Sequence, residues 1–532
     1  HHYPALAPDE YAEVPANTSI LGAAKFSGKT RHGWSIGILE SVTAEEKATI
    51  DREGVRRQEV VEPLTNFFVG RLQKDIRQGN TIIGGIFTAV NRRLDGTGLE
   101  DLLHRSAYAG GMDFQHFWKD RNYVFTARGV FSRVQGSSAA IAATQTAFEH
   151  LFQRPDAPHL RVDSTRTHLQ GHAGTLKLAK FGGGHWRFET GLTWRSPELE
   201  LNDAGFLLST DEINQFTWVG YRIWEPFGIF RNFNLNLNQW NRWNFDGRHL
   251  YQAFNVNANT LFKNYWMTGA GLTIETLDIS QNALRGGPAL RRPPGWAVWA
   301  FVNSPQRRKV QFFGNGFMAR AFGGEVKVEN LSPGVRIQIT DPLDLVLRPS
   351  FFRARRQGDQ YVTQTDFQGT PRYIVGAVEQ KTLQFVIRLN YAITPDLSLQ
   401  YYGQPFISRA TYEGFGFVQA PDARSFTERF HRFSPAQITL QGDTFEVDEN
   451  EDKTVDYTFA KPDFNFVQFR SNLVLRWEYL PGSELFLVWS QSSTPDAFDD
   501  LERGLLSSLS DNLFGTKAHN IFLLKTTYRF LK

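Results

Sequence analysis

Apolar and polar residues alternate most regularly near the C-terminal end of the chain, between residues 464 and 494. A Pro481-Gly482-Ser483 turn divides this stretch into two alternating halves. The pattern predicts a β-hairpin with one apolar and one polar face. Strands of about ten residues that are apolar on one face and charged on the other are typical of transmembrane barrels, because strands of soluble sandwiches usually have about five or six residues.

Similar pairs of alternating segments fill the chain from residue 17 onward and predict about 21 strands. Short turns and long polar loops alternate between these strands, which is typical of bacterial outer-membrane barrels. The predicted long loops are 45–64, 94–106, 135–170, 197–214, 280–294 and 412–463. The sequence therefore predicts an all-β fold with two parts. Residues 1–16 form an N-terminal extracellular loop segment, and residues 17–532 form a large antiparallel transmembrane outer-membrane β-barrel.

The odd number of strands has a consequence for closure of the barrel. A short turn at Thr30–His32 follows the first predicted strand, so this strand runs from the outside inward, and the last strand runs the same way. An ordinary outer-membrane barrel has an even number of strands. We therefore expect at least one strand from upstream of His1 or from another chain, which gives about 22 strands or more in the completed barrel. The same reasoning predicts a periplasmic C-terminus and extracellular long loops.

Polar side chains on the alternating segments are expected to face the barrel lumen. The predicted lumen-facing residues are Asn232, Asn234, Asn236, Asn238, Asn255, Asn257, Asn259, Arg187, Glu189, Arg470, Arg476 and Glu478. Aromatic residues near turns are expected to lie at the membrane interfaces. This predicted girdle comprises Trp118, Trp224, Trp477 and Tyr479, and stacking on sugars is the alternative role for such side chains.

Composition supports a barrel and excludes several classes of site. The chain of 532 residues contains 45 Phe, 16 Tyr and 13 Trp, and 21% of its residues are charged. It has no run of 18 apolar residues, which a transmembrane helix would need. Cysteine is absent, which excludes disulfides and thiolate metal sites. A net charge of +3 gives no reason to expect nucleic acid as a partner.

An acidic segment in the last long loop is a candidate site for a metal cofactor, Ca²⁺. Asp448, Asn450, Asp452 and Asp456 occupy positions 1, 3, 5 and 9 of a calcium-loop pattern. Lys453 stands where that pattern has Gly, and Phe459 stands where it has a bidentate Glu. A solvated extracellular loop is the competing interpretation.

Residues 139–153 are expected to form an amphipathic helix within the longest early loop. Ile141, Phe148, Leu151 and Phe152 would form its apolar side. The helix could fold into the barrel mouth as a lid or plug, or it could pack on neighbouring loops. The sequence leaves both arrangements open.

Several segments together resemble a family of large outer-membrane barrels of unknown function, found in Bacteroidetes-like Gram-negative bacteria. The segments are 20–35, 61–92, 152–156 (FQRPD), 202–206 (NDAGF), 285–288 (RGGP), 402–406 (YGQPF) and 462–491. The resemblance implies an N-terminal domain similar to carbohydrate-binding family nine and several further strands before His1, which would bring the completed barrel to about 26 strands. Both are missing from this sequence, so carbohydrate binding by that domain cannot be carried over.

No local pattern resembles a catalytic centre, so we predict that the protein is not an enzyme. The first functional hypothesis is a porin-like transport channel or plugged pore for polysaccharide or polypeptide. The second is a structural anchor and docking platform for a surface protein complex, and a surface glycan hydrolase is a weaker third. Expected partners are outer-membrane lipid and lipopolysaccharide, the strands that complete the barrel, and a surface protein or polysaccharide.

Overall fold

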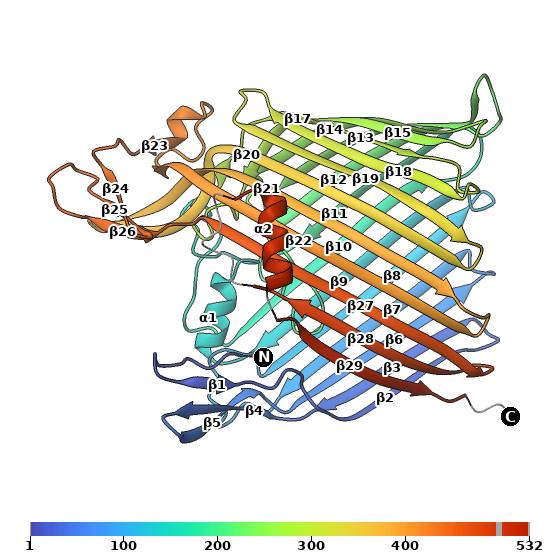
Figure 1. The fold of residues 1–532 in the computed structure, drawn as a ribbon, viewed down its shortest axis with the longest axis horizontal. Helices are drawn as coiled ribbons and strands as arrows, with labels where there is room; N and C mark the ends of the chain where they lie inside the picture. The colour runs from blue at the N-terminus through green and yellow to red at the C-terminus, as the bar shows by residue number, and fades with distance from the viewer. Residues whose placement is uncertain (1, 496–502, 516, 530–532) are drawn as a thin grey trace. The chain divides into compact units, whose positions relative to one another are not determined.

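A barrel sheet of 23 strands dominates the described part of the chain, residues 2–495, 503–515 and 517–529 of a computed structural model (Figure 1). Within those residues, 21 strands of the sheet have nine residues or more, as the alternation predicts. The first twelve strands are β2 (Ile20–Lys29), β3 (Trp34–Thr43), β6 (Thr65–Ile76), β7 (Thr81–Arg92), β8 (Ser106–Trp118), β9 (Tyr123–Gln135), β10 (His168–Lys180), β11 (Trp186–Arg195), β12 (Glu212–Ile223), β13 (Phe230–Trp243), β14 (His249–Phe262) and β15 (Met267–Ser280). The others are β16 (Leu290–Arg291), β17 (Gly295–Asn303), β18 (Val310–Ala321), β19 (Val326–Thr340), β20 (Leu343–Phe367), β21 (Thr370–Ala392), β22 (Leu397–Val418), β23 (Phe430–Arg432), β27 (Phe464–Leu480), β28 (Ser483–Ser493) and β29 (His519–Thr527).

The C-terminal hairpin predicted from the alternation is present as β27 and β28. Its strands pair antiparallel from Phe469 opposite Ser493 to Leu480 opposite Ser483, around the predicted turn. Gly482 has φ +77° in this turn, a conformation that glycine adopts without steric cost. Local alternation and turn chemistry therefore specify this part of the sheet.

Two small sheets lie outside the barrel sheet, in segments that we predicted to be loops. β1 (Tyr11–Glu13), β4 (Glu46–Arg52) and β5 (Val55–Glu62) form the first, and β24 (Ile438–Gln441), β25 (Thr444–Val447) and β26 (Tyr457–Ala460) form the second. Short strands rich in charged residues carry a weak signal, and in the first sheet only Ala48, Ile50 and Val61 supply buried apolar side chains. Residues 1–16, 45–64 and 412–463 thus contain more regular structure than predicted.

The chain forms two compact units. Unit 1 comprises residues 1–221, 238–252 and 279–290, and unit 2 comprises residues 222–237, 253–278 and 291–532. Unit 1 contains the helix α1 (Ser138–Thr146), and unit 2 contains the 3-10 turn η1 (Thr427–Arg429) and the helix α2 (Leu505–Gly515). None of the helices that the structure describes is long and apolar enough to cross a membrane.

Strand registers define a polar face and an apolar face in each unit. In unit 1, Arg71 bonds to Asp113 at 2.8 Å and Lys177 to Glu189 at 3.0 Å on the polar face. The opposite, apolar face carries exposed residues that include Phe87, Met112, Phe131, Leu176 and Leu178. In unit 2 the apolar face has a hollow of about 860 Å³ lined by residues that include Val256, Leu272, Val298 and Met318. An apolar outer face and a polar inner face characterise a transmembrane barrel.

Candidate functional site: a loop cluster on the polar face

Two loops of unit 1, residues 136–167 and 196–211, form a loop cluster. The first begins with α1, which is shorter than the predicted helix over 139–153. Ser137 caps the helix by accepting a hydrogen bond from the Ala140 N–H at 3.1 Å. After Thr146 the chain continues in turns, and Ile141 and Phe152 are buried whereas Phe148 is 48% exposed.

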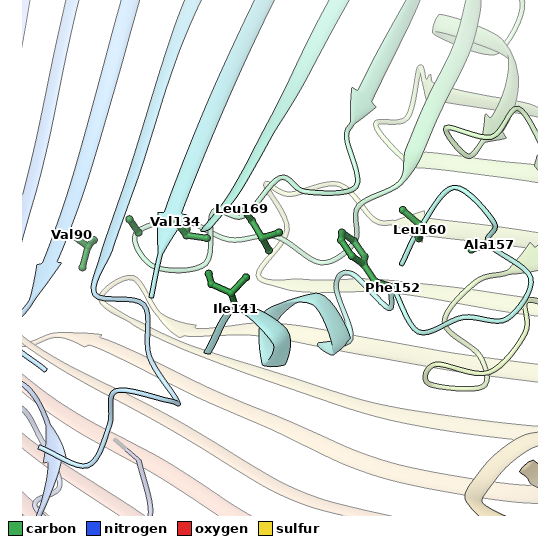
Figure 2. Close-up of a cluster of buried hydrophobic side chains, with 8 residues drawn as sticks. Val90, Val134, Ile141, Phe152, Ala157, Leu160 and Leu169 are labelled. Atoms are coloured by element: carbon green, nitrogen blue, oxygen red, sulfur yellow. The ribbon is translucent and has the colours of Figure 1, made fainter. Parts of the chain in front are cut away.

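Apolar side chains attach the first loop of the cluster to strands of the barrel sheet, which we call the barrel wall. Ile141, Phe152 and Leu160 pack in one buried cluster, shown in Figure 2, that includes the strand residues Val90, Ala107, Val134 and Leu169. Ile86 of β7 stands opposite Arg71, so its side chain is on the polar face. Val90 lies four positions after Ile86 on the same strand and therefore faces the same way. Registers through β8, β9 and β10 place the other three strand residues on that same face. The loop therefore covers the polar face, which favours the lid or plug over packing on loops alone.

The second loop reaches the same face through a close backbone approach. Gly171 lies on β10, two positions after Leu169, and a Cβ added there would lie 2.1 Å from the backbone N of Leu199. Only glycine leaves room for this contact. Leu199 itself is fully buried, so the loop lies directly against the strand.

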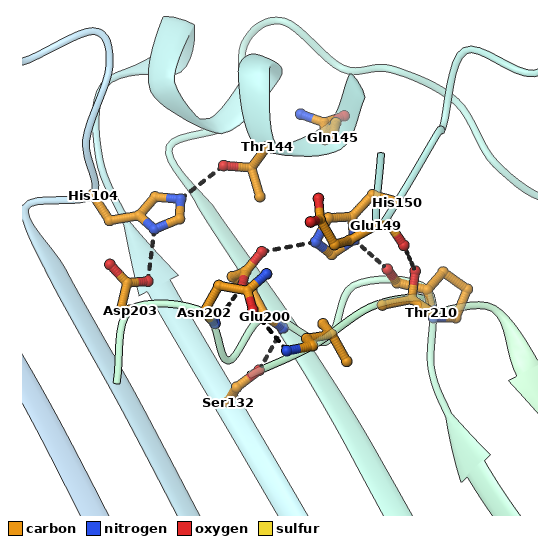
Figure 3. Close-up of polar contacts among 12 residues, drawn as sticks. His104, Ser132, Thr144, Gln145, Glu149, His150, Glu200, Asn202, Asp203 and Thr210 are labelled. Carbon is orange, nitrogen blue, oxygen red and sulfur yellow. Dashed lines mark hydrogen bonds and ion pairs between the residues drawn. The ribbon is translucent and has the colours of Figure 1, made fainter. Parts of the chain in front are cut away.

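The first polar contact of the cluster centres on Asp203 (Figure 3). Its carboxylate accepts from Arg92 Nη1 at 2.5 Å and bonds to His104 Nδ1 at 2.9 Å. The other ring nitrogen, Nε2, lies 2.7 Å from the hydroxyl of Thr144 on α1. Because the Asp203, Arg92 and His104 side chains are only 10–13% exposed, this network joins both loops and the end of β7 in a mostly dehydrated environment.

A second buried contact joins His150 to Glu200. His150 Nε2 lies 2.9 Å from the Glu200 carboxylate, and its Nδ1 lies 2.9 Å from the Pro197 carbonyl. The His150 side chain is fully buried. The Glu200 N–H donates to Ser132 Oγ of β9 at 3.0 Å, so this pair also ties the second loop to the wall.

A third contact surrounds Asp211. Its carboxylate accepts from Arg154 at 3.1 Å and lies 3.0 Å from His159 Nε2, and the Arg154 and Asp211 side chains are each 3% exposed. Nearby, Asp156 accepts from Arg248 at 2.8 Å. Ion pairs this deeply buried are costly to break, because the partner left behind keeps its charge without solvent.

These contacts hold the loop carboxylates in their charged form. Burial alone would raise the pKa of Asp203, but the hydrogen bond from His104 and the charges of His104 and Arg92 outweigh burial and lower it. The pKa of Glu200 is also lowered, because its hydrogen bond to His150 and the one from the Asn202 N–H outweigh burial.

The lowered pKa values predict that the loop cluster loosens in acid. Both carboxylates titrate in the unfolded chain near about 3.9 for Asp and about 4.3 for Glu, above their folded values. Their stabilising contribution is therefore complete above about pH 5, starts to decline as the pH drops below the unfolded-state values, and is lost as the pH falls through the lower folded-state values. We expect amide hydrogen exchange in 138–163, corrected for its intrinsic pH dependence, to speed up between pH 6 and pH 3. Amide protection in 138–163 that does not change over this pH range would contradict the role of these two carboxylates. The same conclusion would follow if a Glu200→Gln/Asp203→Asn variant kept the full pH dependence of exchange.

The predicted asparagines form a ladder of side-chain amides. Asn234 donates to Asn259 at 2.8 Å, Asn236 to Asn257 at 2.7 Å, and Asn257 to Asn255 at 2.6 Å. Asn232 Oδ1 accepts from the Leu261 N–H at 3.3 Å, and Asn238 lies further along β13. These contacts thus join side-chain amides within and between β13 and β14.

The other predicted residues are not members of the loop cluster. Arg476 bonds to Glu478 and Glu484, Arg470 is exposed on β27, and Arg187 donates to the Gly183 and Gly184 carbonyls. In the predicted girdle, Trp118 stacks on Tyr123 with centroids 5.6 Å apart, Trp477 meets Tyr479 at 6.0 Å, and Trp224 is 59% exposed.

The acidic segment uses its carboxylates within its own loop. Asp448 accepts from the Asp452 and Lys453 N–H groups, and Asp456 accepts from the Glu449 N–H at 2.7 Å. Among the residues that the structure describes, no group of three or more His, Cys, Asp or Glu side chains is placed to hold a metal ion. This geometry is that of a hydrogen-bonded loop, and the Ca²⁺ assignment gains no support from it.

Comparison with known families gives one match over nearly the whole chain. The model of the family described as "Domain of unknown function (DUF5916)" matches residues 3–531. The chain belongs to the DUF5916 family. Comparison with curated proteins returns no match. The N-terminal carbohydrate-binding-like domain implied by the resemblance stays a prediction.

Two solved structures share a weak overall similarity with this DUF5916 chain. One is the FpvAI–pyocin S2 complex, with a TM-score of 0.36, 9% identity, and coverage of 86% of this chain and 73% of the other. The second is the siderophore receptor PirA from Acinetobacter baumannii, with a TM-score of 0.36, 8% identity, and coverage of 87% and 76%. Similarity at this level carries no argument about function.

The sequence did not single out the residues that hold the DUF5916 loop cluster together: Arg92, His104, His150, Arg154, Glu200, Asp203 and Asp211. A signal was nevertheless present in the motifs of the resemblance. FQRPD contains Arg154 and Asp156, NDAGF contains Asp203, and RGGP contains Gly286, where an added Cβ would lie 2.5 Å from Gln153. All three motifs belong to the loops of unit 1.

The Thr144–His104–Asp203 order resembles the hydrogen-bond order of a hydrolase triad. The Thr144 hydroxyl, however, also lies 3.0 Å from the Ala140 carbonyl, an acceptor that competes with His104 for the hydroxyl proton. Thr144 is also buried, at 8% exposure, in the middle of the packed helix. These contacts describe a structural clamp rather than an activated nucleophile.

Proposed function

We propose that this DUF5916 protein is a non-enzymatic outer-membrane barrel that acts as a plugged pore for polysaccharide or polypeptide. The observation that carries the proposal is the loop cluster on the polar face of β7–β10. In a transmembrane barrel the polar face lines the lumen, so a loop fixed there narrows the passage. We further propose that the long loops are extracellular and that the C-terminus is periplasmic.

Two buried ion pairs, the buried contact between His150 and Glu200, and one apolar cluster hold this plug. Such an arrangement is stable at neutral pH, yet it depends on a few charged groups that a bound cargo or partner could displace. A wide barrel needs such an obstruction, because barrels of 16–18 strands already leave an aqueous channel. The obstruction would keep the outer membrane tight until cargo arrives.

Planar bilayer recording tests the pore. The intact protein is expected to conduct little, and a variant in which a short Gly–Ser linker replaces 138–163 is expected to conduct strongly. Heat-modifiable migration on gels would verify that both proteins form the barrel. Equal conductance of the two folded proteins would refute the plug.

The long strands of unit 2 favour a docking platform as a second candidate function. β20, β21 and β22 have 25, 23 and 22 residues, about twice the length that spans a membrane. The small sheet β24–β26 packs against them through a cluster that contains Ile374, Phe415 and Tyr457. Strands that continue beyond the membrane in this way present a rigid surface outside it.

Loss of the Arg372 side chain is expected to unfold this platform. Arg372 bonds bidentately to Glu449, whose side chain is 9% exposed, and Tyr457 donates to the same carboxylate at 2.7 Å. Arg372→Ala should cost about 3 kcal/mol locally, because it leaves a buried carboxylate without its cation. Limited proteolysis should then cleave within 430–460, whereas Arg355→Ala should not change the pattern, since Arg353 still pairs with Glu379. Resistance of the Arg372 variant would contradict this role.

We also propose that further strands pair with β2 and β29. All ten residues of β2 and eight of the nine in β29 are exposed, and their registers join them to β3 and β28. A strand edge in hydrocarbon needs hydrogen-bond partners. Photo-cross-linkers at Phe26 and Phe522 should capture strands of the same protein or of another chain in native membranes. Cross-links to lipid alone would refute the proposal.

A further inference from the structure

The polar face differs in chemistry between the two units. In unit 1 it carries ion pairs such as Arg71–Asp113 and Lys177–Glu189. In unit 2, five neighbouring strands carry a run of uncharged side chains on the corresponding face. Asparagines make up this run on β13 and β14, glycine and threonine on β15, and alanine, asparagine and aromatic residues on β17 and β18. Charged groups meet the run at two residues, where Arg222 donates to Asn236 and Arg348 donates to Asn315.

Trp299 and Phe301 lie flat against this surface because glycines stand opposite them. Trp299 pairs with Gly271, where an added Cβ would lie 2.7 Å from the indole Nε1 and 2.8 Å from the Asn257 Cβ. Phe301 pairs with Gly269, where an added Cβ would lie 2.5 Å from the phenyl ring. Each ring therefore packs with one side against a glycine. Both rings lie on the same face of the sheet as the Asn257 side chain.

The two rings together make an aromatic platform. Their centroids are 6.1 Å apart and their planes differ by 6°. Phe317 stands directly opposite Trp299 on the next strand and is 39% exposed, so the aromatic surface continues across β18. A flat, uncharged aromatic surface offers a stacking face without a preference for either sign of charge.

The amides beside the platform supply the complementary chemistry. Asn257 accepts from Asn236 through its oxygen and donates to Asn255 through its nitrogen. A side-chain amide provides two N–H donors and two acceptor lone pairs, so Asn257 keeps one N–H and one acceptor lone pair beyond these two hydrogen bonds. Sugar rings present both apolar C–H faces and hydroxyl groups that donate and accept, which matches this combination of rings and amides.

We infer that Trp299, Phe301 and Asn257 form a binding subsite for uncharged hexose units of a glycan. The inference rests on the proposed pore and narrows its cargo from polysaccharide or polypeptide to neutral polysaccharide. An aromatic ring over glycine also shields the strand backbone, as Trp194 does over Gly174 on the apolar face of unit 1. The amide ladder and the second, parallel ring distinguish the unit 2 platform from that simpler arrangement.

Calorimetric titration of the full protein in detergent with maltohexaose, cellohexaose and dextran hexamer tests the subsite. At least one of these neutral glycans should bind, and Trp299→Ala should weaken it at least about fivefold, whereas Trp299→Phe should retain most of the affinity. Trp296→Ala is the matched control, since Trp296 lies on the same strand with the opposite orientation. Asn257→Ala provides a second variant that leaves the aromatic rings in place and should also weaken binding.

The outcomes separate the subsite from the pore. If none of the neutral glycans binds, or if Trp299→Ala and Trp296→Ala have equal effects, the subsite is refuted even when the linker variant conducts. Preferential binding of an uncharged Gly/Ser/Thr peptide would refute the choice of glycan. If a glycan binds through Trp299 and Asn257 but the folded linker variant does not conduct, the pore is refuted and the glycan site stands.

Discussion

Replacing Asp203 by alanine is expected to release the loop cluster from the polar face. The change leaves Arg92 and His104 buried, each without the carboxylate that now lies within 2.9 Å. Removing one partner of a buried ion pair costs about 3–5 kcal/mol. Because the contacts of Asp203 hold the loops rather than the strands, we expect local opening rather than unfolding of the barrel. Amide exchange in 138–163 should accelerate roughly a hundredfold or more.

A surface ion pair provides the control for this prediction. Asp95 bonds to Arg105 at 2.6 Å, but the two side chains are 74% and 59% exposed. Such pairs contribute at most about 1 kcal/mol, so Asp95→Ala should leave exchange in 138–163 unchanged. Exchange in β8 and β9 serves as the internal reference for an intact barrel. Equal exchange rates in the Asp203 and Asp95 variants would refute the clamp.

Gly171→Ala is expected to displace the second loop by steric conflict alone. The added Cβ would lie 2.1 Å and 2.3 Å from the backbone N and Cα of Leu199, and backbone atoms cannot rotate away. Overpacking of this kind costs about 1–3 kcal/mol or more. Because Leu199 precedes Glu200, the same displacement should separate Glu200 from His150. We expect faster amide exchange in 196–203 and protease cleavage in that loop.

Gly37 is the matched control for Gly171. It lies opposite Arg71 and therefore on the polar face, but an added Cβ there meets nothing within 4 Å. Gly37→Ala should be neutral or slightly stabilising, because alanine restricts the unfolded chain. If Gly171→Ala were as well tolerated as Gly37→Ala, the second loop would not lie against β10.

Alternation predicts the barrel strands well because the relevant signal is local. In β27, side chains two residues apart share a face, so Arg476 and Glu478 could be assigned to one side before any contact was known. The same local argument missed β4 and β25, whose short strands carry too few apolar residues to show a period. Such strands depend on their neighbours more than on their own sequence.

The loop cluster could not be derived from periodicity, because its contacts join distant segments. Asp203 lies 111 residues from Arg92 and 99 from His104, and Glu200 lies 50 residues from His150. Carboxylates are frequent in this chain, so a single Asp or Glu gives no indication of its partner. The motifs around Arg154 and Asp203 indicated the segments that form the loop cluster. Only the fold shows that both segments pack against the same strands of the barrel sheet.

Reversible locking of α1 to the wall tests the plug most directly. Because the chain contains no cysteine, a His104→Cys/Thr144→Cys variant has only the two introduced thiols, at side chains that now lie 2.7 Å apart. A short bis-methanethiosulfonate reagent bridges the two thiols, and a reductant removes the bridge. The same channel in a planar bilayer should conduct little while bridged and conduct stepwise more after reductant, since the substitutions also remove the contact between Asp203 and His104. The His104→Cys single variant should not respond to the reagent. Conductance that stays the same before and after release, with bridging and release verified by mass spectrometry, would contradict a plugged pore.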